Sequence, residues 1–317
     1  MIRCLPFLAC LGLVAPAWAA ADTRTLTFRY VASVGPIEAG RGPVHAWIPL
    51  AREDAFQRVL AESIDASIPG VVEREDVYGN RFWHGKVAAS DGEVVTVTVE
   101  TTVERRVHRG GDAKGDAEDL DRFLRPNERV AVGHPMLDPI LSEIRERAES
   151  DARPDVARAI YDWVVENVEY KKVGSGWGNG DTFWACNERY GNCTDFHALF
   201  ISLARTERIP SRFEIGFPVP EERGAGAIAG YHCWVQFHLP GVGWFPIDAS
   251  EAFKHPEKRE LFYGTHPADR IHLTTGRDLR LGADHRDRPL NYFVYPYVEV
   301  GGEAWQGPIE KSFSYRE

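Results

Sequence analysis

From residue 191 to residue 200 the chain reads GNCTDFHALF, and this stretch decides how the second half of the protein folds. Gly191 and Asn192 are turn residues, and the apolar positions after them recur at helical spacing until Pro210. The pattern predicts a helix over residues 193–208 with Cys193 at its start. Because the unpaired N–H groups and the macrodipole of a helix N-terminus favour negative charge, a cysteine there has a lowered pKa. Cys193 is therefore a candidate nucleophile, and the same N–H groups are candidate oxyanion donors.

Further along the chain, two strand-like segments are joined by a short turn. They cover residues 231–239 and 243–247, with Gly241 in the turn between them. In a hairpin, the start of the first strand lies beside the end of the second, so His232 and Asp248 are predicted neighbours. A thiolate nucleophile needs a base that returns its proton to a leaving group. The hairpin would supply an imidazole that a carboxylate orients.

Several segments together resemble the transglutaminase-like superfamily in its bacterial secreted form. The resemblance rests on residues 191–197, 230–234 and 243–251, and it extends over residues 157–251. Residues 291–296 (NYFVYP) are also similar to such proteins. Each motif alone is weak, but the set is specific.

The resemblance implies a fold and a set of roles. The fold is a papain-like α+β core, in which helices pack on an antiparallel sheet. Cys193 is the nucleophile, His232 the general acid/base and Asp248 the orienting carboxylate. The family also has a donor near the oxyanion, and the candidates here are Trp177, Trp184 and Asn192.

The family includes protein cross-linkers, peptidases, amidases and inactive scaffolds, so the resemblance leaves the reaction open. Its active forms attack a peptide or carboxamide carbonyl and leave a thioester on cysteine. The sequence has no calcium site of the animal cross-linking type, and we expect neither a cofactor nor a metal. We therefore favour hydrolysis of a peptide or protein substrate. The alternatives are acyl transfer of the protein-glutamine transglutaminase type and a non-catalytic peptide- or glycan-binding module.

The first twenty residues predict an export signal. Arg3 precedes a short apolar run over residues 5–14, and Ala17-Trp18-Ala19 fits a signal peptidase site. This run is too short to span about 30 Å of hydrocarbon, and no later segment is long and apolar enough, so we expect no transmembrane segment. The mature protein is expected to be periplasmic or secreted. A formal net charge of -10 argues against a nucleic-acid partner.

The number of cysteines also indicates a free thiol that is available for catalysis. The chain has five, and removal of a signal peptide over residues 1–20 leaves Cys186, Cys193 and Cys233. An odd number means that at least one thiol lies outside any intramolecular disulfide. Cys233 follows His232 on the predicted strand, so we expect it on the opposite face, away from Cys193 and packed in the core. A Cys186–Cys233 disulfide is an alternative, and His197 is interpreted as a packing residue near the site.

The chain divides by composition into a β-rich first half and a mixed second half. Short strands with regular turn signals predict a β-sandwich-like domain over residues 22–110, followed by a linker over residues 111–135. Helices are predicted over residues 137–149 and from Pro154 onwards. The transglutaminase-like domain is expected over residues 136–300, and residues 301–317 are expected to form a C-terminal tail.

Overall fold

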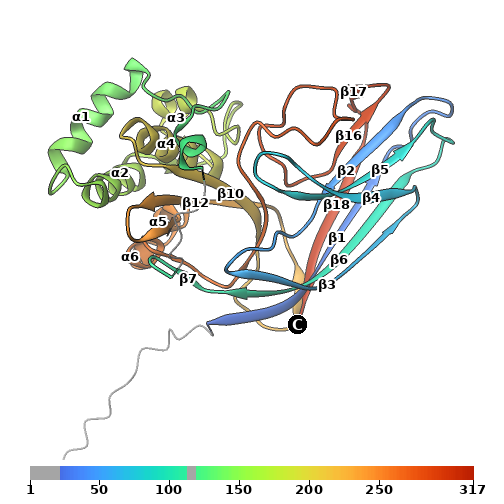
Figure 1. Cartoon of the computed structure of the whole chain (residues 1–317), viewed down its shortest axis with the longest axis horizontal. Coiled ribbons are helices and arrows are strands. Elements are labelled where there is room, and N and C mark those ends of the chain that lie inside the picture. Colours follow the sequence, from blue (N-terminus) through green and yellow to red (C-terminus); the bar gives the residue numbers. More distant parts are fainter. Residues whose placement is uncertain (1–21, 113–118) are drawn as a thin grey trace, which may run out of the picture.

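A computed structural model of the chain describes residues 22–112 and 119–317, and the predicted signal peptide lies outside this part (Figure 1). Helices gather at one end of the molecule and long strands at the other. Within these two described ranges, no helix is long and apolar enough to cross a membrane.

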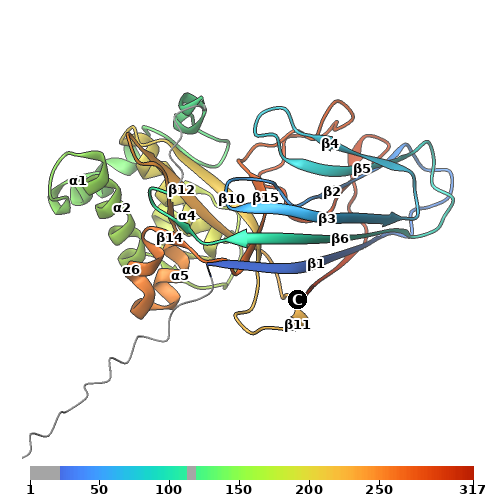
Figure 2. The same ribbon diagram turned by 60° about the horizontal axis from the view of Figure 1, so that its bottom comes forward.

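The β-rich end consists of two five-stranded sheets, stacked as layers in Figure 2. All strand pairs in both sheets are antiparallel. In order, the first sheet contains β11 (Ala225–Ala227), β18 (Ile309–Arg316), β1 (Thr23–Val34), β6 (Val95–Arg106) and β3 (Gln57–Ala66). The second contains β17 (Glu303–Ala304), β16 (Tyr297–Val300), β2 (Val44–Pro49), β5 (Arg81–Val87) and β4 (Gly70–Arg74). Period-two alternation explains the layers, since β1 buries every second residue between the sheets.

The end of the chain differs from the expected tail. β18 pairs with β1 along residues 309–316 and 27–34, so the last strand lies beside the first described one. Phe313 and Tyr315 on β18 are buried, and this burial fixes the strand in the sheet. β3 lies within the predicted sandwich range, but most of its residues are exposed or half-buried.

The helix-rich end is an α+β core, as predicted. Its four-stranded antiparallel sheet runs in the order β13 (Gly243–Ile247), β12 (His232–Leu239), β10 (Ser211–Pro218) and β15 (Arg270–Thr275). The helices are α1 (Asp138–Arg147), α2 (Arg153–Asn167), α3 (Thr182–Glu188), α4 (Cys193–Thr206), α5 (Ala249–Lys254) and α6 (Arg259–Phe262). Nearly every residue of α4 is buried, and the helix packs against β12 and β10 at the centre of this region.

Short elements complete the chain. Two two-stranded ladders form, one parallel between β8 (Glu169–Tyr170) and β9 (Tyr190–Gly191), and one antiparallel between β7 (His108–Arg109) and β14 (Thr265–His266). The 3-10 helices are η1 (Leu120–Leu124), η2 (Pro135–Leu137) and η3 (Pro256–Lys258).

The two ends share one hydrophobic core. Phe217 on β10 packs against Phe28 on β1 and Phe313 on β18, with ring centroids 5.1 and 4.3 Å apart. The sandwich therefore supports the sheet that carries the candidate site.

Candidate active site

Cys193 is the first residue of α4, as the turn residues before it predicted. Asn192 caps the helix by accepting the Thr194 N–H at 2.9 Å. The carboxylate of Asp195 accepts the Asn192 N–H at 2.9 Å, which completes a capping box. Sequence and structure agree on the start of this helix because the turn residues that precede it act locally.

The hairpin brings His232 and Asp248 together. His232 opens β12, and Asp248 follows the last residue of β13 and caps α5. The Nε2 of His232 lies 2.7 Å from Oδ2 of Asp248, which confirms the predicted contact. His232 also hydrogen-bonds the Cys193 thiol, which contributes to the raised pKa of the imidazole. The three residues thus form a chain from thiol to imidazole to carboxylate.

The electrostatics of this chain favour a thiolate–imidazolium pair. Burial opposes ionisation of Cys193, but hydrogen bonds from Cys233 and His232 and the nearby imidazoles hold its pKa well below the ordinary value. Burial likewise opposes protonation of His232, yet the Asp248 carboxylate and the Cys193 sulfur raise the pKa of this imidazole to about 10. Both residues are then charged at neutral pH.

Asp248 is the buried anion on which this arrangement depends. It has no exposed surface, and its carboxylate accepts the Glu251 N–H and the Ser250 hydroxyl, both at 3.0 Å. The Arg270 guanidinium donates to it at 3.4 Å. Burial would raise the pKa of Asp248, but the facing histidines outweigh it and keep the pKa well below its usual range. A carboxylate so stabilised stays ionised and orients His232.

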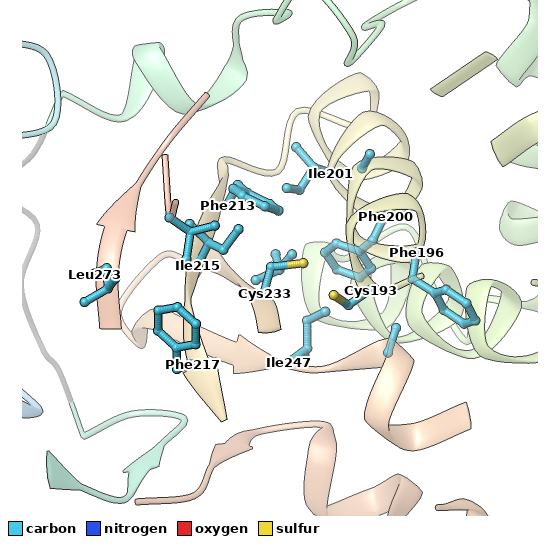
Figure 3. Close-up of a cluster of buried hydrophobic side chains, with 14 of the residues drawn as sticks. Cys193, Phe196, Phe200, Ile201, Phe213, Ile215, Phe217, Cys233, Ile247 and Leu273 are labelled. Carbon is cyan, nitrogen blue, oxygen red and sulfur yellow. The ribbon is translucent and has the colours of Figure 1, made fainter. Parts of the chain in front are cut away.

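Cys233 is directed toward Cys193, and the prediction that it points away was wrong. Figure 3 shows both sulfur atoms entering the gap between α4 and β12. His197 Nδ1 lies 3.4 Å from the Cys233 sulfur, and its Nε2 lies 3.5 Å from Asp248 Oδ1. Adjacent residues on β12 do face opposite sides, but α4 lies on the side of Cys233. His232 reaches the thiol from the other side because it stands at the end of the strand.

The candidate oxyanion donors have other partners. The indole N–H of Trp177 donates to the Gly174 carbonyl at 3.2 Å, and that of Trp184 donates to the Tyr190 carbonyl at 3.1 Å. The Asn192 side chain donates to the Tyr231 hydroxyl at 2.9 Å. The first N–H groups of a helix have no partner within the helix, so the backbone N–H of Cys193 is a further candidate donor beside the sulfur.

A glycine-rich loop lies against the start of α4. Its Gly178 and Gly180 N–H groups donate to the Asp195 carboxylate at 2.6 and 3.0 Å. Both glycines have positive φ angles, a conformation that side-chain-bearing residues rarely adopt. The Tyr292 hydroxyl donates to the Gly178 carbonyl at 3.2 Å, and Arg277 Nη1 donates to the Gly180 carbonyl at 2.7 Å. A hollow of about 360 Å³ on the α3 side of this loop is lined by Trp184 and other residues, not by Cys193.

The alternative disulfide does not form. Cys186, Cys193 and Cys233 are all free, buried thiols. Burial raises the pKa of Cys186 to about 11 and that of Cys233 well above its ordinary value. Cys193 is the thiol that the surroundings ionise.

Sequence reasoning missed several contributors to the site. Arg270 comes from β15 and carried no motif. Cys233 and Tyr231 flank His232 in the sequence, and this proximity indicated a place near the site. The prediction that Cys233 lies on the opposite face of the strand hid this indication. His197, interpreted from the sequence as a packing residue, also lies 3.4 Å from the Cys233 sulfur and 3.5 Å from the Asp248 carboxylate.

Comparisons with known proteins agree with this geometry. The sequence model described as the transglutaminase-like superfamily matches residues 139–249, which include Cys193, His232 and Asp248. An uncharacterized protein of Haemophilus influenzae is 25% identical over an alignment 318 residues long, gaps included. The alignment covers 88% of this chain and 86% of that protein.

Among solved structures, one of a candidate cysteine protease from Cytophaga hutchinsonii has a TM-score of 0.56 and 19% identity. The match covers 92% of this chain and 90% of that one, so the fold is shared across both ends of the molecule. The periplasmic domain of TgpA from Pseudomonas aeruginosa matches 74% of this chain and 90% of its own, with 17% identity and a TM-score of 0.33. The family match and the helix-on-sheet core agree that residues 139–249 form a domain of the transglutaminase-like superfamily.

Proposed function

We propose that the protein is a thiol enzyme that cleaves peptide or carboxamide bonds through a thioester on Cys193. The observation that carries this proposal is the buried chain of Cys193, His232 and Asp248, in which the thiol pKa is lowered and the imidazole pKa is raised. A nucleophile, an acid/base and an orienting carboxylate in contact are the parts that acyl transfer to sulfur requires.

The proposed reaction has two halves. The Cys193 thiolate attacks the substrate carbonyl carbon, and the oxyanion that forms is held by the Cys193 N–H at the start of α4. The C–N bond then breaks as the His232 imidazolium gives its proton to the leaving amine, which leaves a thioester and a neutral imidazole. In the second half, His232 takes a proton from water, the hydroxyl adds to the thioester, and the carboxylic acid leaves as Cys193 is restored.

Hydrolysis is the preferred outcome because it needs no second substrate. The Cytophaga neighbour, which is described as a candidate cysteine protease, is in line with hydrolysis. The rival outcome is transfer to an amine, and one observation favours it. Cys193 is only 2% exposed, and a sheltered thioester survives longer against water. In either case the buried sulfur requires the surroundings to open for a peptide or protein substrate.

The site of action that we propose is outside the cytoplasm. The export signal predicted from residues 1–20 supports this location. A cysteine nucleophile there does not depend on a metal or on a diffusible cofactor for the steps given above.

Trapping the acyl-enzyme tests the proposal. Purified protein is incubated with a periplasmic peptide extract, quenched in acid and analysed by intact-mass and peptide mass spectrometry. We expect an acyl group on Cys193 that disappears on incubation at neutral pH, with a free carboxylic acid as the product. If added primary amines become covalently attached instead, the reaction is acyl transfer. Absence of any Cys193 adduct, together with saturable peptide binding by Cys193→Ala, would favour a binding module.

A further inference from the structure

The second sheet of the sandwich has a polar face that the proposed reaction does not use. In the β2–β5 ladder His45 pairs with Lys86 and Trp47 pairs with His84, so these four side chains share one face. The opposite face of the sheet packs into the main core. The segment from residue 276 to residue 296 covers the polar face through a small apolar cluster that contains Trp47, Phe82, Leu279, Leu281 and Phe293.

Two buried histidines meet on this face. His45 Nδ1 lies 2.9 Å from His84 Nε2, and each residue is 5% exposed. The Oδ2 atom of Asp284, from the covering segment, lies 4.0 Å from the same His45 nitrogen. These three ligand atoms all lie within 4.8 Å of one another. We propose that His45, His84 and Asp284 bind a divalent transition-metal ion, for which Zn²⁺ is the best fit.

Glu73 on the neighbouring strand β4 prepares His84 for this role. Its Oε1 atom lies 3.0 Å from His84 Nδ1, so Nδ1 carries the proton and Nε2 presents a lone pair toward His45 and Asp284. Metal-ligating histidines almost always donate their other ring N–H to a carboxylate, a carbonyl or water.

The distances suit a small tetrahedral ion after a modest shift. With Zn–N and Zn–O distances of about 2.0–2.2 Å, neighbouring ligand atoms lie about 3.3 Å apart. The two imidazoles must separate slightly, and Asp284 must approach. Asp284 can approach because it lies between strands and its side chain is 34% exposed. Water would take the fourth position. Two imidazoles and one carboxylate select a borderline ion such as Zn²⁺ over Mg²⁺ or Ca²⁺, which prefer oxygen ligands.

Lys86 provides a competing cation. Its Nζ lies 2.9 Å from Asp284 Oδ2, and its side chain is 54% exposed. An ion bound by the two histidines would take this carboxylate from the ammonium group. Removing Lys86 therefore distinguishes two roles of Asp284. If Asp284 is a metal ligand, the loss of Lys86 frees its carboxylate for the ion. If Asp284 is only half of a surface ion pair, the same loss leaves it without its partner.

Metal binding would fix the covering segment to the sandwich. The same segment carries Asn291 and Tyr292, which donate to the Asn179 and Gly178 carbonyls of the glycine-rich loop beside α4. The ion would thus stabilise a segment that reaches from the sandwich to the candidate active site, while it takes no part in the chemistry there.

Calorimetric titration of the full chain with ZnCl₂ tests the proposal, after treatment with a chelator and dialysis. A Cys193→Ala background removes the active-site thiolate as a competing ligand. We expect one equivalent of Zn²⁺ to bind with micromolar or tighter affinity and to raise Tm, while Mg²⁺ and Ca²⁺ do neither. Asp284→Asn, at a partly exposed position that leaves the core intact, should weaken binding at least about tenfold.

Lys86→Met is the matched control, since it breaks the same ion pair from the other side. It should bind Zn²⁺ as tightly as the background protein or more tightly. His84→Gln should remove the same equivalent that Asp284→Asn weakens. The proposal is overturned if no saturable Zn²⁺ binding occurs, or if Asp284→Asn and His84→Gln bind Zn²⁺ unchanged.

Discussion

The catalytic core and the sandwich each contain a buried pair of histidines beside carboxylates, but the pKa of His232 is raised and that of His45 is lowered. At the active site, His232 faces Asp248, which is completely buried and 2.7 Å away. On the sandwich, His45 has Asp284 at 4.0 Å, with that carboxylate partly exposed and already paired with Lys86.

The difference shows how depth and distance of a carboxylate set the state of an imidazole. Burial disfavours the charged form at both places. The Asp248 carboxylate overcomes this cost and raises the pKa of His232 to about 10. The carboxylates near His45 do not, and the pKa of this histidine is lowered, with His84 and Lys86 adding to the effect of burial. His232 is therefore suited to proton transfer, whereas the site that we propose for a metal ion has a carboxylate that is more distant and partly exposed.

Removing the thiol should have the largest effect. We expect Cys193→Ala to lose turnover by at least about a thousandfold, because the neighbouring thiol, Cys233, has a pKa raised well above its ordinary value and stays protonated. The measurement is release of the leaving amine from a substrate found by the trapping experiment. Cys186→Ala is the control, since this buried thiol lies on α3 and has a raised pKa of about 11. Retained turnover in Cys193→Ala would contradict the mechanism.

Removing the charge of Asp248 should make His232 resemble His45. In Asp248→Asn we expect kcat to fall about 10³–10⁴-fold, because the imidazole loses the anion that orients and charges it. The His232 pKa, followed by NMR, should fall below its ordinary value as burial becomes dominant. The variant should also lose about 3–5 kcal/mol of stability, since the buried Arg270 charge loses its partner. An unchanged His232 pKa would break the comparison between the two pairs.

Removing the second sulfur should have an intermediate effect. In Cys233→Ala the Cys193 thiolate loses a hydrogen bond, and a bond to a charged group contributes about 1.5–3 kcal/mol. We therefore expect the Cys193 pKa to rise by about one to two units. The rate of alkylation by iodoacetamide as a function of pH measures this shift. Cys233→Ser keeps a donor and should restore most of the original profile, which a purely steric role for Cys233 would not predict.

Changing pH alone should have the smallest effect near neutrality. The lowered pKa of Cys193 keeps its thiolate present below the range of an ordinary thiol, and the raised pKa of His232 keeps its proton up to about 10. We expect kcat/KM to change less than about twofold between pH 7 and pH 9, to fall in acid as the thiolate is protonated, and to fall above about pH 10 as His232 loses its proton. If kcat/KM instead fell in acid with the pKa of a free thiol, the Cys193–His232 ion pair would not form.

Local sequence features predicted much of the candidate site. The turn residues before Cys193 predicted the start of α4, and the short turn after β12 was enough to place His232 beside Asp248. Both inferences needed only residues close in the chain, where backbone geometry leaves few options.

Tertiary packing decided the rest. Which face of β12 receives α4 depends on contacts between distant residues, so the adjacent positions 232 and 233 could not reveal that Cys233 lies beside the nucleophile. Arg270 reaches Asp248, and β18 reaches β1, only because separate elements share one core. The same holds for His45, His84 and Asp284, which are far apart in the chain and meet only when a long segment crosses the sheet. Sequence periodicity reports which residues are buried within one element, whereas the partner that buries them is fixed only when the whole chain packs.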